Sequence, residues 1–193
     1  LNTVEAVIEE CIKEDVKYLT LYTFSKENWK RPKKEVNFLF DLLENFLNKK
    51  IDYLIKKKIK LKFIGELNKL PQTLRKLLKN SEKKTSQNSI IQVNVALNYG
   101  SKSELINSVR LISKKKIKIN EENINKNLFT NNQPNPDILI RTGNTQRLSN
   151  FMLWQIAYTE IFFEKKLWPD FKKKDLKKIL TKFKYIKRNY GSI

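Results

Sequence analysis

The chain has 193 residues, of which 40% are hydrophobic, and this is enough for one well-buried domain. It carries 40 basic and 20 acidic residues and no histidine, which excludes Ser-His and Cys-His nucleophile pairs and most zinc sites. Its one cysteine excludes an internal disulfide, and no apolar run approaches the roughly 18 residues that span a bilayer. No secretory signal pattern opens the sequence, so we expect a cytoplasmic protein, soluble or at most peripheral to a membrane.

Apolar residues occur in short strand-like runs that alternate with longer stripes at helical spacing. The first expected elements are a helix at residues 2–14, a strand at 18–24 and helices at 32–47 and 50–57. Next come a strand at 59–64, a helix at 71–86, a strand at 90–97 and helices at 100–112 and 121–128. The last are a strand at 137–140, a helix at 150–158, a strand at 160–163 and a helix at 172–189. This order predicts an α/β fold with a central, mainly parallel β-sheet flanked by helices, in a single domain over residues 1–193.

Arginine is rare in this lysine-rich chain, and its placement indicates a site. Of six arginines, Arg31, Arg141 and Arg147 lie in two polar loops, residues 25–31 and 141–149, that each follow a predicted strand. The carboxyl ends of parallel strands meet at one edge of a sheet, where ligands bind. A guanidinium can hold two oxygens of a phosphate or carboxylate at once. We interpret the two loops as halves of one anion site.

Each candidate also has a purely structural interpretation. The first loop could be a plain connection with Trp29 packed in the core, and Arg141 could pair with a carboxylate while Ser149 caps the helix at 150–158. Glu160 either is exposed at the start of its strand or is partly buried and needs a partner or a metal. Without histidine, a metal here should be a hard, oxygen-binding ion such as Mg²⁺.

The net charge of +20 raises the possibility of nucleic-acid binding. However, the lysines are spread over every segment, and we favour a solvated surface over a nucleic-acid groove. Glycine occurs only at positions 65, 100, 143 and 191, so neither a Walker loop nor a dinucleotide fingerprint can be present.

Three long motifs resemble those of the cis-prenyltransferases, the undecaprenyl or polyprenyl diphosphate synthases. They are TLYTFSKENWKRPKKEV at residues 20–36, IRTG at 140–143 and RLSNFMLWQIAYTE at 147–160. Residues 94–100 and 167–171 agree as well, so the resemblance covers nearly the whole chain. It implies prenyl transfer, in which isopentenyl diphosphate condenses with an allylic prenyl diphosphate to form a cis-polyprenyl diphosphate, a lipid carrier for cell-wall synthesis.

The resemblance also implies roles for individual residues. The substrate-binding positions are Ser25, Lys26, Glu27, Trp29, Arg31, Arg141, Arg147, Leu148 and Ser149. Of these, Arg141, Arg147 and Ser149 would hold the diphosphate of isopentenyl diphosphate, and Glu160 would help to bind Mg²⁺. Asn28 matches the catalytic position of the proton acceptor. Because a neutral amide is a weak base, we expect Asn28 to orient the substrate or a water while a phosphate oxygen takes the proton.

Further expectations concern the product and the assembly. An apolar tunnel would hold the growing chain, among residues such as Leu19, Leu21, Val93, Val95 and Leu139. The resemblance implies a homodimer, with possible peripheral membrane contact when the product leaves, and no nucleic-acid partner.

The sequence departs from the family pattern in two places. The amino-terminal strand and phosphate loop of the family, with its Mg²⁺-binding aspartate, do not precede residue 2, so we expect an amino-terminally truncated domain with little activity alone. Asn144-Thr145-Gln146 stands where the family places Gly-Glu, so a carboxylate is missing at Thr145. The alternative function is a non-catalytic, substrate-binding or partner-dependent subunit of the same fold, and a nucleic-acid-binding domain is a third hypothesis.

Overall fold

The computed structural model describes residues 2–189. These residues form two compact units, which are described separately: a larger unit of residues 15–131 and a smaller unit of residues 2–14 and 132–189. The single domain expected from the sequence stays a prediction.

The larger unit is built on a parallel sheet of three strands. The strands are β1 (Tyr18–Ser25), β2 (Ile59–Ile64) and β3 (Ile91–Tyr99), in the order β1-β3-β2. β3 lies in the middle, with Val95 opposite Leu21 of β1 and opposite Phe63 of β2. All but one of its residues are buried, as expected for a nearly continuous apolar run in a strand covered on both faces.

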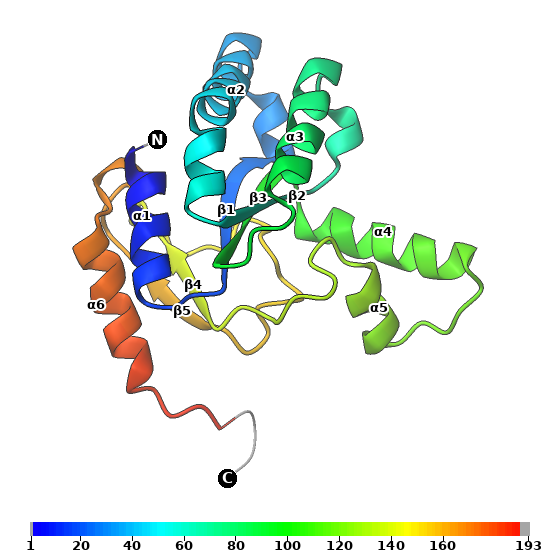
Figure 1. Cartoon of the computed structure of the whole chain (residues 1–193). Coiled ribbons are helices and arrows are strands. Elements are labelled where there is room, and N and C mark those ends of the chain that lie inside the picture. The colour runs from blue at the N-terminus through cyan, green and yellow to red at the C-terminus, as the bar shows by residue number, and fades with distance from the viewer. Residues whose placement is uncertain (1, 190–193) are drawn as a thin grey trace. The chain divides into compact units, whose positions relative to one another are not determined.

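Helices complete the larger unit. Helices α2 (Lys33–Lys56) and α3 (Gln72–Thr85) pack against each other and against β2, so they lie side by side over the sheet (Figure 1). Helix α4 (Ser101–Lys114) packs on the short α5 (Glu121–Asn127). Two single-turn 3₁₀ helices, η1 (Lys26–Lys30) and η2 (Leu67–Lys69), follow β1 and β2. Helix α3 turns an apolar stripe inward, with Leu74 and Leu78 buried.

The outer edge of β2 is closed by side chains of α3. The backbone N–H of Leu61 donates to Thr85 Oγ1 (3.1 Å), and that of Phe63 donates to Glu82 Oε1 (2.7 Å). Unpaired N–H groups on an edge strand invite pairing with another chain. Here two of them are satisfied inside the unit.

The smaller unit combines a two-stranded parallel sheet with two long helices. It contains α1 (Asn2–Lys13), β4 (Ile138–Arg141), β5 (Glu160–Phe163), the 3₁₀ turn η3 (Trp168–Asp170) and α6 (Lys173–Lys184). Helices α1 and α6 lie side by side (Figure 1), joined by ion pairs from Lys173 to Glu9 (2.6 Å) and from Lys184 to Glu14 (3.0 Å). Cys11 is buried in the apolar stripe of α1.

The α/β class and the five predicted strands are confirmed, and most ends agree within two residues. The structure places the strands in two sheets, of three and two strands, and α2 continues through residues 48–49 without a break. The helix predicted at 150–158 is wrong: this segment consists of turns, because Ser149, Asn150 and Met152 have φ values of 51, 60 and 47 that a right-handed helix cannot contain. The expected last helix ends early, at Lys184. The apolar tunnel stays a prediction.

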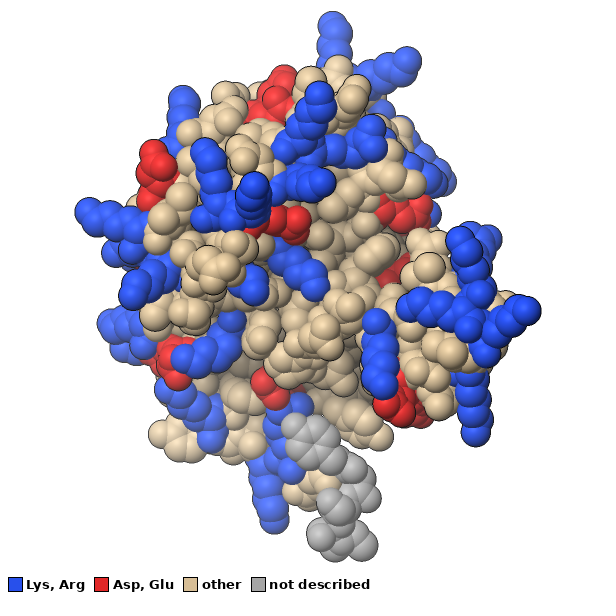
Figure 2. Space-filling model, turned by 45° about the vertical axis from the view of Figure 1, so that its right-hand side comes forward, with Lys and Arg blue, Asp and Glu red and all other residues tan. Residues whose placement is uncertain are grey.

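Lysine and arginine side chains are spread over much of the face seen in Figure 2, with acidic and uncharged surface between them. Between residues 2 and 189, no helix combines the length and the apolar character needed to cross a membrane.

Candidate active site

The first polar loop is a single 3₁₀ turn attached to the carboxyl end of β1. The backbone N–H of Ser25, the last residue of β1, donates to Asn28 Oδ1 (2.9 Å), and the N–H of Arg31 donates to the Asn28 carbonyl oxygen (3.0 Å). Both bonds fold the chain back at Asn28. The side-chain amide of Asn28 is therefore fixed by its own turn, with its carbonyl oxygen already accepting one hydrogen bond.

Trp29 is held at the sheet edge by one hydrogen bond and two rings. Its Nε1–H donates to Asn98 Oδ1 (2.8 Å), and its ring lies 5.2 Å from that of Phe24 and 5.6 Å from that of Phe40, centroid to centroid. The side chain nevertheless stays 41% exposed. Trp29 is thus neither a core residue nor a free surface ring, but a fixed ring with one open face.

Asn98, near the end of β3, makes this arrangement possible. It is buried, and its Nδ2 donates to the carbonyl oxygen of Glu66 (2.9 Å) while its Oδ1 accepts from Trp29. Its φ of 47 is in the left-handed region, which asparagine tolerates better than most residues. Beside it, Gly65 lies so close to β3 that a Cβ would be 2.0 Å from the Leu97 carbonyl oxygen. Asn98 and Gly65 therefore hold the carboxyl ends of β1, β2 and β3 close together.

Lys26 belongs to the same edge but is already engaged. Its Nζ donates to Glu66 Oε1 (2.5 Å) and to Ser103 Oγ (2.8 Å), and Lys69 approaches the other Glu66 oxygen at 3.1 Å. Burial alone would raise the pKa of Glu66, but the hydrogen bonds from Lys26 and Lys69 hold it below its ordinary value. An ammonium has three N–H donors, so one donor of Lys26 remains for a substrate oxygen.

The other predicted residues of this loop are exposed. Arg31 pairs with Glu35 at 2.6 Å across one turn, and both side chains are nearly half exposed. Glu27 is exposed on η1. A surface pair of this kind contributes little to stability and can exchange partners, so Arg31 stays accessible to an anion.

The second polar loop is arranged around Arg141, the last residue of β4. Arg141 donates from Nε to Thr145 Oγ1 (2.8 Å) and from Nη1 to Ser149 Oγ (3.3 Å). The predicted cap role of Ser149 is wrong, because no helix follows it; its hydroxyl contacts the guanidinium instead. Leu148 is half-buried and Arg147 is exposed.

The cations of this loop are not neutralised locally. Within residues 2–189, no carboxylate forms an ion pair with Arg141 or Arg147, whereas Arg31 pairs with one carboxylate and Arg188 with two. The alternative interpretation, in which Arg141 only forms an ion pair with a nearby carboxylate, therefore does not agree with the structure.

Glu160 lies at the opposite end of its strand pair from Arg141. The parallel register sets Glu160 opposite Ile138 and Arg141 opposite Phe163, which separates the two ends by about 10 Å at 3.3 Å per residue. Arg188 approaches Glu160 at 4.0 Å and binds Asp137 at 2.5 Å. The Glu160 side chain is 35% exposed, which agrees with the partly buried interpretation.

These residues offer Mg²⁺ few ligands of their own. Glu160 supplies carboxylate oxygens, which a hard cation prefers. However, the part of the chain from residue 2 to 189 contains no cluster of three or more His, Cys, Asp and Glu side chains that could hold a metal. Glu160 could therefore supply only one ligand of a metal, and the remaining ligands would have to come from other oxygens.

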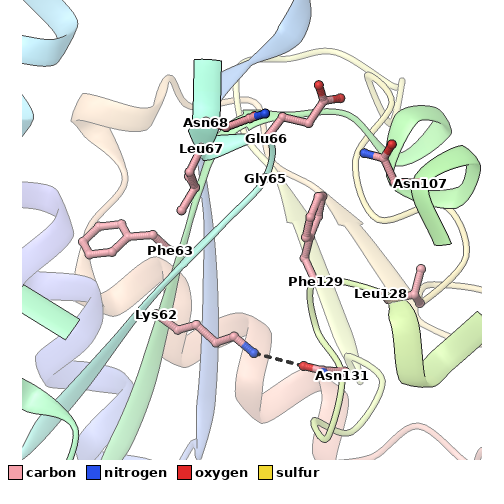
Figure 3. A pocket seen from close by; sticks show the side chains of 10 residues that line it. All are labelled: Lys62, Phe63, Gly65, Glu66, Leu67, Asn68, Asn107, Leu128, Phe129 and Asn131. Atoms are coloured by element: carbon pink, nitrogen blue, oxygen red, sulfur yellow. Dashed lines mark hydrogen bonds between the residues drawn. The ribbon is translucent and has the colours of Figure 1, made fainter. Parts of the chain in front are cut away.

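An open groove of about 540 Å³ lies in the larger unit and is lined in part by Gly65 and Glu66 of the same sheet edge (Figure 3). Lys62 extends into it and donates to Asn131 Oδ1 at 3.4 Å. Burial lowers the pKa of Lys62, and Glu82 opposes this shift. None of the site residues predicted from the sequence lines this groove.

Three residues that the sequence did not single out shape the two loops: Glu66, Asn98 and Thr145. The sequence could have marked Glu66 and Asn98 as site candidates, because both lie at the carboxyl ends of predicted strands, near Gly65 and Gly100. Thr145 was noted only as a departure from the family pattern.

The comparisons with known proteins agree with one another. Residues 1–191 match the family model Prenyltransf, which describes undecaprenyl diphosphate synthases. The chain is 42% identical to an isoprenyl transferase of Oceanobacillus iheyensis, over 100% of this chain and 79% of the relative. It is 37% identical to an isoprenyl transferase of Campylobacter jejuni, over 99% of this chain and 85% of the relative.

Two solved structures are similar over 99% of this chain. One is the crystal structure of a "probable undecaprenyl diphosphate synthase" from Campylobacter jejuni, with a TM-score of 0.92, 37% identity and 91% of that chain covered. The other is lavandulyl diphosphate synthase from Lavandula x intermedia in complex with dimethylallyl diphosphate, with a TM-score of 0.94, 31% identity and 86% of that chain covered. The chain therefore belongs to the undecaprenyl diphosphate synthase family of prenyltransferases.

Proposed function

We propose that this chain performs cis-prenyl transfer with isopentenyl diphosphate as the acceptor. The allylic C–O bond of a prenyl diphosphate breaks and releases pyrophosphate, the terminal carbon of isopentenyl diphosphate bonds to the allylic carbon, and one proton leaves. The observation that carries the proposal is the loop after β4, where Arg141 and Arg147 present two guanidinium groups that no carboxylate among residues 2–189 pairs with. In a prenyltransferase, such a loop suits the diphosphate of the substrate.

Arg141 and Arg147 would hold the diphosphate of isopentenyl diphosphate, with Ser149 and the neighbouring Leu148 completing this part of the site. Arg141 is half-buried and prearranged by its two hydroxyl partners, while Arg147 is exposed and can close on the anion. Two bidentate contacts fix the orientation of the diphosphate, which positions the double bond for attack.

The turn after β1 would supply the rest of the substrate-binding residues. The open face of Trp29 gives an apolar surface beside polar groups of Ser25, Lys26, Glu27 and Arg31, which suits the junction between a prenyl chain and its diphosphate. Because Asn28 Oδ1 already accepts the Ser25 N–H, its role is orientation of substrate or water. A phosphate oxygen is the stronger base and takes the proton.

Magnesium completes the proposal. Bound Mg²⁺ neutralises diphosphate charge and favours the departure of pyrophosphate. Glu160 would contribute one carboxylate ligand, and Arg188, 4.0 Å away, would have to yield part of its contact. We also propose a cytoplasmic homodimer that contacts a membrane surface when it releases a long product.

The test is turnover by the purified chain. Labelled isopentenyl diphosphate is incubated with Mg²⁺ and, in separate reactions, with dimethylallyl, geranyl or farnesyl diphosphate, and products are separated by chain length. NMR of the new double bonds distinguishes cis from trans. Cis products, even if formed slowly, are the expected result. Calorimetric binding of isopentenyl diphosphate without turnover would favour the alternative, a partner-dependent binding subunit, and neither binding nor turnover would refute the proposal.

A further inference from the structure

Arg141 is held by an unusual combination of contacts for an arginine of this chain. Its hydrogen-bond partners are two neutral hydroxyl groups, Thr145 Oγ1 at Nε and Ser149 Oγ at Nη1, at 2.8 and 3.3 Å. By contrast, Arg31 and Arg188 bind carboxylates at 2.6 and 2.5 Å. A hydroxyl restricts where the guanidinium lies, but it leaves the positive charge uncompensated.

The contact to Nε has a different consequence from the contact to Nη1. A guanidinium carries five N–H groups, one on Nε and two on each Nη. With Nε bound to Thr145 and one Nη1 hydrogen bound to Ser149, three N–H groups remain, one on Nη1 and two on Nη2, and they include donors at the outer end of the fork. That end can contact two oxygens of one phosphate group.

The position of Thr145 is fixed by the backbone just before it. Gly143, with a φ of 89, donates its N–H to the carbonyl oxygen of Lys166 (2.7 Å), and Asn144, with a φ of 53, donates to that of Glu164 (3.2 Å). Both acceptors belong to the segment that follows β5. The turn therefore presents the Thr145 hydroxyl to Arg141 before any ligand binds.

We propose that Thr145 is a positioning residue for isopentenyl diphosphate binding: its hydroxyl fixes Nε of Arg141, so that the outer end of the guanidinium faces the diphosphate with its full charge. This inference rests on the proposed function. Thr145 does not touch the substrate, and it acts only through Arg141. The hydroxyl is the essential group, and the methyl group of threonine is dispensable.

The test compares Thr145→Val, which keeps the branched shape and removes the hydroxyl, with Thr145→Ser, which keeps the hydroxyl. Thr181→Val, an exposed threonine on α6, is the matched control. The dissociation constant for isopentenyl diphosphate, measured by calorimetry, should rise about tenfold or more in Thr145→Val, as expected for one hydrogen bond to a charged group. It should stay within about twofold of wild type in Thr145→Ser and Thr181→Val. In a turnover assay, Thr145→Val should raise KM for isopentenyl diphosphate more than it changes kcat.

A second measurement needs no substrate. The Nε–H resonance of Arg141, assigned by its loss in Arg141→Lys, should exchange slowly with water in the wild type and Thr145→Ser, and faster in Thr145→Val. Wild-type affinity in Thr145→Val, or equal losses in Thr145→Val and Thr145→Ser, would overturn the inference while leaving the proposed function intact. Failure of the wild type itself to bind isopentenyl diphosphate would overturn the proposed function instead, and this inference with it.

Discussion

Replacing Asn98 with alanine should destabilise the larger unit by about 3 to 4 kcal/mol. The side chain is only 1% exposed and makes two hydrogen bonds, to Trp29 Nε1 at 2.8 Å and to the Glu66 carbonyl oxygen at 2.9 Å. Each is worth about 1 kcal/mol net. The left-handed φ of 47 adds about 1 to 2 kcal/mol once asparagine is lost, because alanine tolerates it poorly.

Asn98→Gly separates the two contributions. Glycine removes both hydrogen bonds but accepts a positive φ, so its effect should be smaller than that of alanine by about 1 kcal/mol. Asn107→Ala is the control. Asn107 is a half-buried asparagine on α4, and within residues 2–189 its side chain makes no hydrogen bond that the substitution would remove. It should change the free energy of unfolding by no more than about 0.5 kcal/mol.

The assay is equilibrium urea unfolding followed by Trp29 fluorescence. The chain has three tryptophans, and the other two, Trp154 and Trp168, lie in the smaller unit. Replacing those two with phenylalanine makes Trp29 a reporter of the larger unit alone. The emission of folded Asn98→Ala should also shift to the red, because the indole loses its fixed partner. A destabilisation below about 1 kcal/mol in Asn98→Ala, or alanine and glycine variants of equal stability, would refute this account of Asn98.

Four further outcomes are expected. Gly65→Ala should destabilise the larger unit by several kcal/mol, because its Cβ would meet the Leu97 carbonyl oxygen at 2.0 Å; an unchanged thermal midpoint would contradict this. Glu66 has a lowered pKa, so its ionised form stabilises the folded chain above the ordinary value of 4.5, and this contribution disappears as the pH falls through the folded value. The difference in unfolding free energy between wild type and Glu66→Gln should therefore shrink from neutral pH to about pH 3, and a constant difference would argue against the linkage. Burial, with a smaller contribution from nearby Glu10, raises the pKa of Cys11 to about 12, so a thiol reagent at about pH 8 should label it only in denaturant, and fast native labelling would disprove its inaccessibility. Arg147→Lys should weaken isopentenyl diphosphate binding about tenfold, whereas the exposed control Arg110→Lys should not, and equal effects would remove the assigned role of Arg147.

Periodicity was sufficient to find the strands, because each is a short apolar run bounded by polar residues. Residues 91–97 illustrate this, since only Gln92 and Asn94 interrupt the apolar run, and a nearly continuous apolar run is typical of a strand buried on both faces. The same reasoning failed at 150–158, where Phe151, Trp154 and Tyr158 have helical spacing. Left-handed conformations at Ser149, Asn150 and Met152 prevent the helix, and spacing carries no information about them.

The candidate site was predictable where it depends on strand ends and residue chemistry. Both arginine loops do follow parallel strands, and the turn at Asn28 begins where β1 ends. The contacts of Asn98 with Trp29 and of Glu66 with Lys26 join residues about 40 to 70 positions apart, so only the folded chain could reveal them. The roles of the predicted site residues in binding and catalysis stay predictions.

The hydroxyl partners of Arg141 also bear on how acidity affects this loop. A carboxylate partner would gain a proton in acid and change the electrostatic potential around the guanidinium. Neither threonine nor serine ionises in the range where proteins stay folded, and arginine keeps its proton throughout. The hydroxyl contacts of Arg141 thus add no ionisable partner, and at this loop the pH dependence of binding should follow the ionisation of the diphosphate itself.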